Sequence, residues 1–367
     1  TIMLIVLLLL ILKPNYYYYL MDRTYRLFDD NLELFNSMLK DIASAKRYVF
    51  VETYRFGIGS IGEKFRNALI KKVREGIRVK VLIDGWGSNS DTSFYTPMIE
   101  AGVELRIYRK LKFARTYFAK NHCRNHRKLI IIDNNISYIG SSNLTAYSLN
   151  WRELNLRINE PTLTKLFKNS FNDSFRSYDK YSLSKHSYKR NQYYNSWIFL
   201  QDVPNPYRQT IKKKYEQMID SAEKEIIIES PYFLPGYKLR KKLCEAVERG
   251  VNVIAIMPYH SDVHLVDIIR RKYLGELHEG GVTLRFFNQG NLHAKCLMID
   301  NDVFSISSAN FDYRSFRYQY EVALIGDEQK VLDPLRNHID ITLSNCQEFN
   351  YENWKKRSRI EKFFEWI

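Results

Sequence analysis

Short apolar runs alternate with amphipathic segments along most of the chain. Residues 48–52 and 226–229 are apolar runs of strand length, and each follows a polar stretch that is typical of a helix end. Residues 63–75 and 237–249 carry apolar side chains at helical spacing, and a glycine follows each segment within one residue. Short buried strands that alternate with amphipathic helices predict an α/β architecture with a mixed, largely parallel sheet.

The same order of elements, strand-helix-strand-helix-strand, occurs twice along the chain. Residues 76–83 match residues 250–256 at an offset of 174, and residues 102–107 match residues 281–286 at an offset of 179. Solenoid repeats have periods of about 20–50 residues, so this longer period indicates a duplicated domain instead. Two such domains are expected to pack with pseudo-twofold symmetry, matching face to matching face.

The predicted organisation has two domains between a terminal segment at each end. The parts are an N-terminal apolar membrane segment with its flank (1–28), a first domain (29–180), a second domain (197–350) and a basic, aromatic tail (351–367). Residues 180–196, rich in Lys, Tyr and Ser, have little periodicity and are interpreted as a linker. The tail fits an interfacial amphipathic helix and a helix packed on the second domain equally well.

The N-terminal segment Ile2–Leu12 is a run of eleven apolar residues. As a helix it rises roughly 16 Å against about 30 Å of hydrocarbon, so it spans a membrane only as part of a longer helix. We favour the second half of a transmembrane helix, because the chain starts at Thr1 and no small residues typical of a signal-cleavage site follow. A signal-peptide core or a buried element is the alternative. Basic residues and four consecutive tyrosines after the run predict that the remaining chain lies on the cytoplasmic side of a cell membrane.

Charge and composition narrow the classes of partner. Lys and Arg number 56 against 41 Asp and Glu, so the net charge of +15 favours an anionic partner, either nucleic acid or an acidic membrane surface. Hydrophobic residues make up 45% of the chain, which is too many for a disordered protein. The four cysteines lie far apart, which excludes both a disulfide-stapled scaffold and the ligand spacing of a zinc site.

One polar motif recurs at the same place in each half of the repeat. The two copies have the same spacing and are offset by 167 residues at every position. The first copy contains His126, Lys128, Asp133, Ser141 and Asn143, and the second contains His293, Lys295, Asp300, Ser308 and Asn310. Because two identical sets stand in matching slots of a duplicated fold, they are interpreted as one shared active site.

The residue types of this motif suit phosphodiester chemistry. On a strand, His126 and Lys128 point to the same side, as do His293 and Lys295, so pseudo-twofold packing brings both pairs to one cleft. One imidazole can act as a nucleophile and the other as a general acid and base. The ammonium groups, with Asn143, Asn310 and the two motif serines, can hold the non-bridging oxygens of the phosphate. This chemistry requires no metal and no cofactor, and no acidic cluster in the sequence suggests one.

Two pairs of carboxylates stand in or near the motif: two aspartates within it and two glutamates after it. Asp133 and Asp300 belong to the recurring catalytic set, but they have opposite strand parity to the histidines, so a structural role is favoured for them. Glu153 follows Asn143 by ten residues, and Glu321 follows Asn310 by eleven. Each glutamate either accepts a hydrogen bond from an imidazole and fixes its tautomer, or is an ordinary carboxylate at a strand end.

The recurring motif resembles the signature of the phospholipase D superfamily, His-x-Lys-x4-Asp-x6-Gly-Ser-x-Asn. The first copy matches completely, and the second departs once, with Ser307 where glycine is usual. More specifically, residues 30–350 are similar to bacterial cardiolipin synthases. The stretches that carry this resemblance are Asn125–Lys128, Trp151–Glu153, Ser230–Pro235, Asn291–Lys295 and Asn310–Phe316 with Glu321.

The resemblance implies a fold of two phospholipase D-like α/β/α domains and a ping-pong phosphatidyl transfer at the membrane. A phosphatidyl group moves from one phosphatidylglycerol to another through a phosphatidyl-histidine, and glycerol is released. In the superfamily the N-terminal histidine is usually the nucleophile, which gives this role to His126 and the acid and base role to His293. The implied partners are anionic phospholipids, above all phosphatidylglycerol, and a membrane.

Three other functions fit parts of the sequence. One is a phospholipase D that uses water as the acceptor, and another is a phosphodiesterase or nuclease of the same superfamily, since the positive charge and the aromatic content also suit nucleic acid. The third is an inactive membrane-binding protein, which the two intact motifs disfavour. The N-terminal apolar run and the context Arg314-Ser315-Phe316 favour lipid over nucleic acid.

Overall fold

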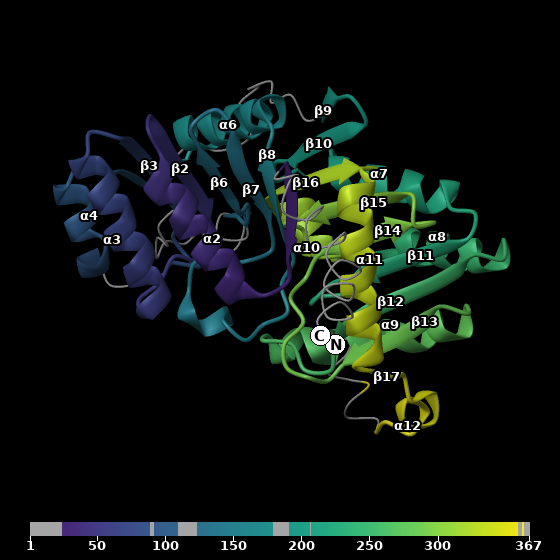
Figure 1. Ribbon diagram of the computed structural model, residues 1–367. Helices are drawn as coiled ribbons and strands as arrows, with labels where there is room; N and C mark the ends of the chain where they lie inside the picture. The colour runs from purple at the N-terminus through teal and green to yellow at the C-terminus, as the bar shows by residue number, and fades with distance from the viewer. Residues whose placement is uncertain are drawn as a thin grey trace, which may run out of the picture.

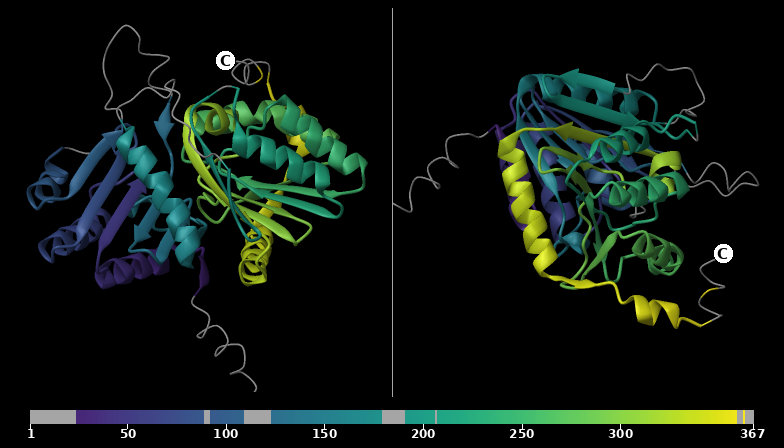
Figure 2. Two further views of the ribbon diagram at one scale, coloured as in Figure 1. Left: turned by 90° about the horizontal axis from the view of Figure 1, so that it is seen from above. Right: turned by 90° about the vertical axis from the view of Figure 1, so that its right-hand side faces the viewer.

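The chain folds into two similar halves that lie side by side, each built on its own β-sheet (Figures 1 and 2). The computed structural model describes residues 24–88, 92–108, 123–178, 191–205, 207–358 and 362. The apolar run Ile2–Leu12 and most of the predicted linker lie outside these residues. No helix of the described part of the chain is long and apolar enough to cross a membrane.

The first half forms a sheet with the strand order β1-β8-β7-β6-β2-β3-β4. Strands β2, β3 and β4 run parallel, and the other neighbours in this sheet pair antiparallel. The strands are β1 (Tyr25–Phe28), β2 (Tyr48–Thr53), β3 (Arg78–Asp84), β4 (Glu104–Tyr108), β6 (Leu129–Ile132), β7 (Ile136–Gly140) and β8 (Asn155–Asn159). The helices are α2 (Asn31–Ser44), α3 (Ser60–Arg74), α4 (Thr96–Glu100) and α6 (Pro161–Arg176), with the 3-10 turns η1 (Thr92–Phe94) and η2 (Ala146–Ser148).

The second half repeats this design with the order β17-β13-β12-β11-β14-β15-β16-β10-β9. Its strands are β9 (Asn191–Tyr194), β10 (Trp197–Asp202), β11 (Glu225–Glu229), β12 (Asn252–Pro258), β13 (Thr283–Phe287), β14 (Cys296–Ile299), β15 (Val303–Ser307), β16 (Gln319–Gly326) and β17 (Cys346–Glu348). Its helices are α7 (Thr210–Ser221), α8 (Tyr237–Glu248), α9 (His264–Glu279), α10 (Tyr313–Tyr318), α11 (Gln329–Ser344) and α12 (Tyr351–Lys355). The predicted α/β fold with a mixed sheet in each half is confirmed, and α3 and α8 correspond to the two predicted helices.

The periodicity of the sequence explains these elements. In α3 the side chains of Ile61, Phe65 and Leu69 recur at helical spacing and are buried on one face. All six residues of β2 are buried, because helices cover both faces of the sheet and leave no face to water. The first four residues of β2 are therefore continuously apolar instead of alternating, as the sequence indicated.

Three hydrophobic cores hold the two halves, and one of them is shared. The shared core contains Phe50 and Phe171 of the first half together with Phe199 and Leu324 of the second. Each half also has an outer core of its own beneath its outer helices. In addition, the short strand β5 (Arg124–Asn125) of the first half pairs in parallel with the start of β16 in the second. The two halves are therefore joined by both apolar packing and backbone hydrogen bonds.

Two details differ from the sequence-based organisation, whose domain limits stay a prediction, and a third bears on the tail. Strand β1 lies in the flank that we placed before the first domain and pairs with β8. Strand β9 lies in the predicted linker and pairs with β10. In the tail, Trp354 of α12 packs against Gly275 of α9 and donates a hydrogen bond of 2.7 Å from Nε1 to the carbonyl of Arg271. This contact favours the domain-packing interpretation for α12.

Candidate active site

The two histidines of the motif stand just before corresponding strands of the two sheets. His126 lies between β5 and β6, and His293 lies directly before β14. The sequence predicted that each histidine and its lysine belong to a strand, but the structure has irregular segments there. The reason is that the backbone N–H of His126 donates to the carbonyl of Tyr320, and that of His293 to the carbonyl of Arg152, each in the other half. The histidine segments therefore cross to the neighbouring domain before their strands begin.

Each motif lysine is held beside its histidine by a backbone contact. The Nζ atom of Lys128 donates to the carbonyl oxygen of His126 at 2.8 Å, and Lys295 makes the same 2.8 Å contact with the carbonyl of His293. All four side chains are buried or nearly so. Histidine and lysine thus stay together as the parity argument predicted, although the cause is this hydrogen bond and not a strand.

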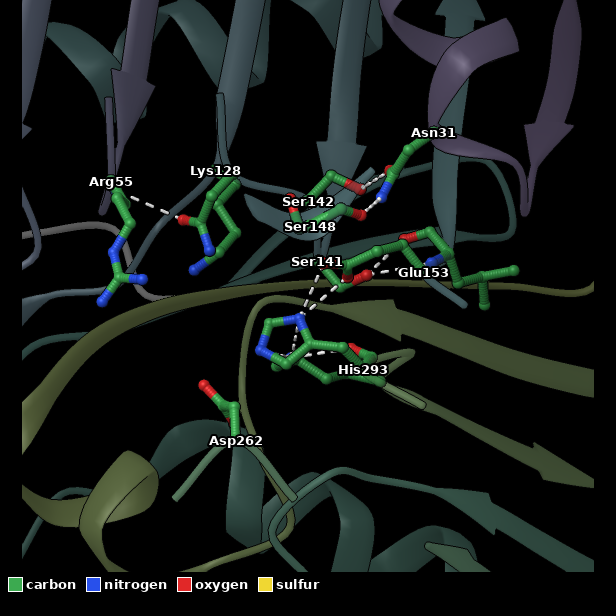
Figure 3. Close-up of polar contacts among 12 residues, drawn as sticks. Asn31, Arg55, Lys128, Ser141, Ser142, Ser148, Glu153, Asp262 and His293 are labelled. Atoms are coloured by element: carbon green, nitrogen blue, oxygen red, sulfur yellow. Dashed lines mark hydrogen bonds and ion pairs between the residues drawn. The ribbon is translucent and has the colours of Figure 1, made fainter. Parts of the chain in front are cut away.

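The two glutamates contact the histidines across the boundary between the halves. Glu321 of β16 lies 3.0 Å from Nδ1 of His126, measured from Oε1. Glu153, just before β8, places Oε1 and Oε2 at 2.8 and 2.9 Å from Nδ1 of His293 (Figure 3). Each half therefore supplies the carboxylate that orients the imidazole of the other half. Because a carboxylate occupies Nδ1 in both rings, Nε2 is the nitrogen that remains for chemistry, and in His293 it lies 3.2 Å from Nζ of Lys295.

The motif serines lie behind the glutamates instead of lining the space between the histidines. Ser308 donates from Oγ to Oε2 of Glu321 at 2.5 Å and accepts a hydrogen bond from the N–H of Val322. Ser141 is fully buried next to Glu153 and exchanges hydrogen bonds with the backbone of Leu154 (Figure 3). In this position the serines hold the carboxylates in place, and phosphate binding by Ser141 and Ser308 stays a prediction.

The motif asparagines remain candidates for phosphate binding. Asn143 is buried and accepts a hydrogen bond on Oδ1 from the N–H of Arg55 at 3.2 Å. Asn310 is also buried, and its Oδ1 has no hydrogen-bond partner among the described residues. A buried polar atom without a partner is costly, so a ligand hydroxyl that donates to Oδ1 stabilises this position, whereas phosphate oxygens can only accept from Nδ2 of the asparagines.

The two motif aspartates lie at the far ends of their strands and bind backbone. Asp133 accepts hydrogen bonds from the N–H groups of residues 46, 47 and 48. Asp300 accepts them from residues 223, 224 and 225. Since a strand advances about 3.3 Å per residue, seven residues separate each aspartate from its histidine by far more than a hydrogen bond. The structure thus separates Asp133 and Asp300 from the rest of the predicted catalytic set and gives them the structural role that their parity indicated.

The electrostatic environments of the two histidines differ. Burial, with Lys128 and Lys295 nearby, holds the pKa of His126 well below its usual value. Burial also raises the pKa of Glu321, its partner, to about 7. On the other side, burial opposes the ionisation of Glu153, but His293 and Lys295 outweigh it and keep the pKa of Glu153 below normal. Burial also lowers the pKa of His293, although ionised Glu153 opposes this shift. Near neutral pH His126 is therefore uncharged, and His293 differs from it in facing an ionised carboxylate that favours its protonated form.

Burial also weakens the charge of both lysines. The pKa of Lys128 falls to about 7 and that of Lys295 to about 8, because both ammonium groups are removed from water. A bound anionic phosphate diester between them favours their charged forms and so reverses part of this shift.

Several side chains that complete the site were not singled out from the sequence. Tyr54 follows β2, and its ring lies 5.0 Å from the imidazole of His126, while the ring of Trp151 lies 5.1 Å from that of His293. Asp262 points toward His293 from the side opposite Glu153 and accepts a hydrogen bond of 2.7 Å from the hydroxyl of Tyr232 (Figure 3). Trp151 and Tyr232 stood in stretches that carried the family resemblance, but Tyr54 and Asp262 lie in loops with no repeated signal.

The described residues contain no group of three or more His, Cys, Asp and Glu side chains that could hold a metal ion. The two imidazoles and the two ammonium groups lie close enough together to influence one another's charge, and the two motif asparagines stay candidates for the same position. These groups can bind a single phosphate diester and supply a nucleophile and a proton.

Known proteins with similar sequences share this duplicated arrangement. A family model described as "Cardiolipin synthase, PLD-like domain", where PLD denotes phospholipase D, matches residues 38–175 and 215–342. The chain is 31% identical to the cardiolipin synthase of Listeria welshimeri, over 94% of this chain and 74% of that protein. It is 29% identical to the cardiolipin synthase of Clostridium perfringens, over 93% of this chain and 75% of that protein.

Solved structures with a similar fold are more distant in sequence. The phosphatidylserine synthase of Haemophilus influenzae superimposes with a TM-score of 0.73 over 94% of this chain and 91% of that chain, at 14% identity. The polyphosphate kinase of Porphyromonas gingivalis superimposes with a TM-score of 0.65 over 90% of this chain and 49% of that chain, at 12% identity. At these identities the likeness shows a common fold.

Proposed function

The chain belongs to the cardiolipin synthase family of phospholipase D-like phosphatidyltransferases, and we propose that it moves a phosphatidyl group from one phosphatidylglycerol to another. The observation that carries this proposal is the reciprocal pairing of His126 with Glu321 and of His293 with Glu153. Both histidines thereby present Nε2 to one site, which is what a two-step transfer through one covalent intermediate requires. The same reciprocity supports pseudo-twofold packing of the two domains.

In the first proposed step, Nε2 of His126 attacks the phosphorus of the donor lipid. A P–N bond forms, the P–O bond to the headgroup glycerol breaks, and protonated His293 gives its proton to the departing oxygen. In the second step, His293 removes the proton from a hydroxyl of the acceptor phosphatidylglycerol. That oxygen attacks the phosphorus, the P–N bond breaks, and His126 is restored as a neutral imidazole. Lys128 and Lys295 neutralise the charge of the non-bridging oxygens throughout.

The difference in charge environment supports these roles. A nucleophilic imidazole must be uncharged, and the low pKa of His126 keeps it so. A general acid must carry a proton, and ionised Glu153 stabilises the imidazolium of His293 against burial, which lowers the pKa of this histidine. The alternatives, transfer to water or cleavage of a nucleic acid, use the same first step and differ only in the acceptor or the donor.

We also propose that the enzyme works at a cell membrane with its catalytic domains on the cytoplasmic side. This rests on the apolar run Ile2–Leu12, the tyrosines that follow it and the basic residues of its flank. Anionic phospholipids are then the partners that the net positive charge favours.

The decisive experiment is product analysis after incubation of the purified full-length chain with phosphatidylglycerol vesicles. We expect cardiolipin and free glycerol in equal amounts by mass spectrometry, and the same yield in EDTA once the ionic effect on the vesicles is matched. Labelled single-stranded DNA, offered in a parallel reaction, should remain intact. Phosphatidic acid as the main product would identify a hydrolase, and cleaved DNA would identify a nuclease.

The two glutamates are expected to contribute unequally. Glu153→Gln removes the negative charge that favours the imidazolium, so it should lower kcat by about 10²-fold. It should also move the alkaline limb of the pH–rate profile to lower pH, because the pKa of His293 falls. Below pH 7 Glu321 is largely protonated, since its pKa is raised to about 7, and glutamine mimics that neutral form. Glu321→Gln is therefore the matched control, with a loss of less than about 10-fold. Equal losses with unshifted profiles would contradict this asymmetry.

A further inference from the structure

Exposed large apolar side chains are concentrated at one edge of the molecule. Thirteen such side chains are exposed among the residues that the structure describes. Ten of them follow the ends of strands at the edge where the active site lies, and these ten are called the rim: Leu32, Ile58, Trp86, Tyr147, Tyr207, Tyr237, Tyr259, Val263, Leu265 and Tyr313. The other three, Ile99, Tyr193 and Ile341, lie elsewhere.

The topology of the sheets places the rim residues on a common side. Strands β1, β2 and β3 of the first sheet run in one direction, as do β10, β11 and β12 of the second. The loops after these strands therefore leave each sheet at the same edge. His126 and His293 precede antiparallel strands, so they stand at that edge too. Since the two histidines share one site, the rim loops of both halves lie at the same edge as that site.

Hydrogen bonds between the rim loops agree with this placement. In the first half, Gly57 donates to the carbonyl of Leu144, and Asn31 donates from Nδ2 to the carbonyl of Ser148. In the second half, the N–H of Leu234 donates to the carbonyl of Phe311. These bonds bring the loops that carry Leu32, Ile58 and Tyr147 together in one half. In the other half they join the loops that carry Tyr237 and Tyr313.

The exposed apolar residues occur in matching loops of the two halves. Tyr147 and Tyr313 both follow the motif asparagine, while Trp86 and Tyr259 both follow the second parallel strand. Exposed aromatic side chains around one site are unfavourable on a surface that faces water, because each exposes apolar area to the solvent. Their presence in both halves indicates that the whole rim, and not a single loop, is covered by something apolar.

Positive charge lies within the rim. Arg55 stands over the ring of Tyr147 with its guanidinium 5.8 Å from the ring centroid. Arg314, next to Tyr313, is exposed and close enough to lower the pKa of His126. Apolar and aromatic side chains around basic ones are the composition of a surface that enters the interface of an anionic membrane.

We infer that the rim is a bilayer-docking face, which inserts its apolar side chains into an anionic membrane surface and places the active site over the lipid phosphates. The inference rests on the proposed function for its substrate, because a diester at the headgroup level reaches the two histidines without leaving the bilayer. A separate segment such as Ile2–Leu12 can tether the chain, whereas the rim sets the orientation in which the site faces the headgroups.

Photo-crosslinking in the full-length chain tests whether the rim contacts lipid, and the result does not depend on how the chain is tethered to the membrane. Benzoylphenylalanine is introduced at Tyr237 on the rim or at Tyr193 on another side, and the protein is reconstituted into phosphatidylglycerol–phosphatidylcholine vesicles. We expect roughly ten-fold more lipid adduct at Tyr237 by mass spectrometry. Equal adduct at both positions would overturn the inference. Crosslinks between two copies of the chain at Tyr237 would instead make the rim a protein interface.

Activity provides a second, independent readout. The triple variant Ile58→Ser, Tyr237→Ser, Leu265→Ser is compared with the control Tyr193→Ser, Ile341→Ser on phosphatidylglycerol in vesicles and on a short-chain, monomeric phosphatidylglycerol. We expect the triple variant to lose roughly ten-fold in kcat/KM on vesicles only, and the control to lose on neither substrate. Equal loss on both substrates would contradict docking. If the wild type transfers neither lipid, the proposed function fails while the crosslinking result still decides the docking face.

Discussion

The His126→Ala enzyme is expected to form no covalent lipid adduct and to lose roughly 10⁴–10⁶-fold in kcat, as enzymes do when their nucleophile is removed. In the proposed mechanism Nε2 of His126 makes the bond to phosphorus, and alanine has no group that can replace it. Neither Lys128 nor the backbone can replace this nitrogen, because Lys128 is held by the carbonyl of residue 126. The second step then has no intermediate to act on, so hydrolysis and transfer are lost together.

The measurement is rapid denaturation at alkaline pH, which preserves a P–N bond, followed by mass mapping of the peptides around both histidines. The wild type should carry the phosphatidyl group on His126. The control variant His278→Ala, which removes an exposed histidine outside the site, should carry the same amount of this adduct. Thermal unfolding of His126→Ala checks that the fold is intact. An adduct on His293 in the wild type would exchange the two roles, and product formation without any adduct would indicate direct displacement by the acceptor.

The repeat and the recurring polar residues of the site could be predicted from the sequence, because both appear in the spacing of residue types along the chain. Apolar periodicity marks α3 and α8, and the offset of 167 residues marks the histidine and lysine positions without any knowledge of the fold. Strand parity also separated Asp133 and Asp300 from the histidines, and the structure places them at the other end of their strands. Patterns of this kind can be recognised from sequence spacing alone, without knowing how the two halves contact each other.

The contacts that complete the site depend on how the domains sit against each other, and no local pattern contains that information. The sequence offered Glu153 and Glu321 as partners for imidazoles, but it could not tell that each one reaches the histidine of the other half. For the same reason the strand prediction at His126 differed from the structure: its backbone N–H is satisfied by Tyr320 of the second sheet. For the same reason the sequence could not show that Ser141 and Ser308 lie next to Glu153 and Glu321.

The asymmetry between the two halves follows from these cross-domain contacts. Both histidines descend from one motif, yet His293 faces Glu153 at two oxygens and Asp262 on its other side, whereas His126 faces a glutamate whose pKa is raised. A duplicated site with identical motif residues can thus divide the roles of nucleophile and acid through the surrounding charges alone.

This division predicts that His293→Ala separates the two steps of the reaction. With phosphatidylglycerol as donor the variant should lose about 10²–10⁴-fold in kcat, since glycerol then leaves as an unprotonated alkoxide. With a donor whose leaving group is p-nitrophenolate, which needs no protonation, the adduct on His126 should still form at a rate within about ten-fold of the wild type. The adduct should then persist, because no base activates the hydroxyl of the acceptor.

Stopped-flow release of p-nitrophenolate measures the first step, and mass mapping over time measures the decay of the adduct. We expect a burst equal to the enzyme concentration followed by a slow steady state in His293→Ala, and no burst in His126→Ala. The matched pair of variants controls for general damage, because both remove the same imidazole from equivalent positions. A burst of equal size in both variants, or in neither, would show that the two histidines do not hold different roles, and the charge asymmetry between Glu153 and Glu321 would then have no catalytic consequence.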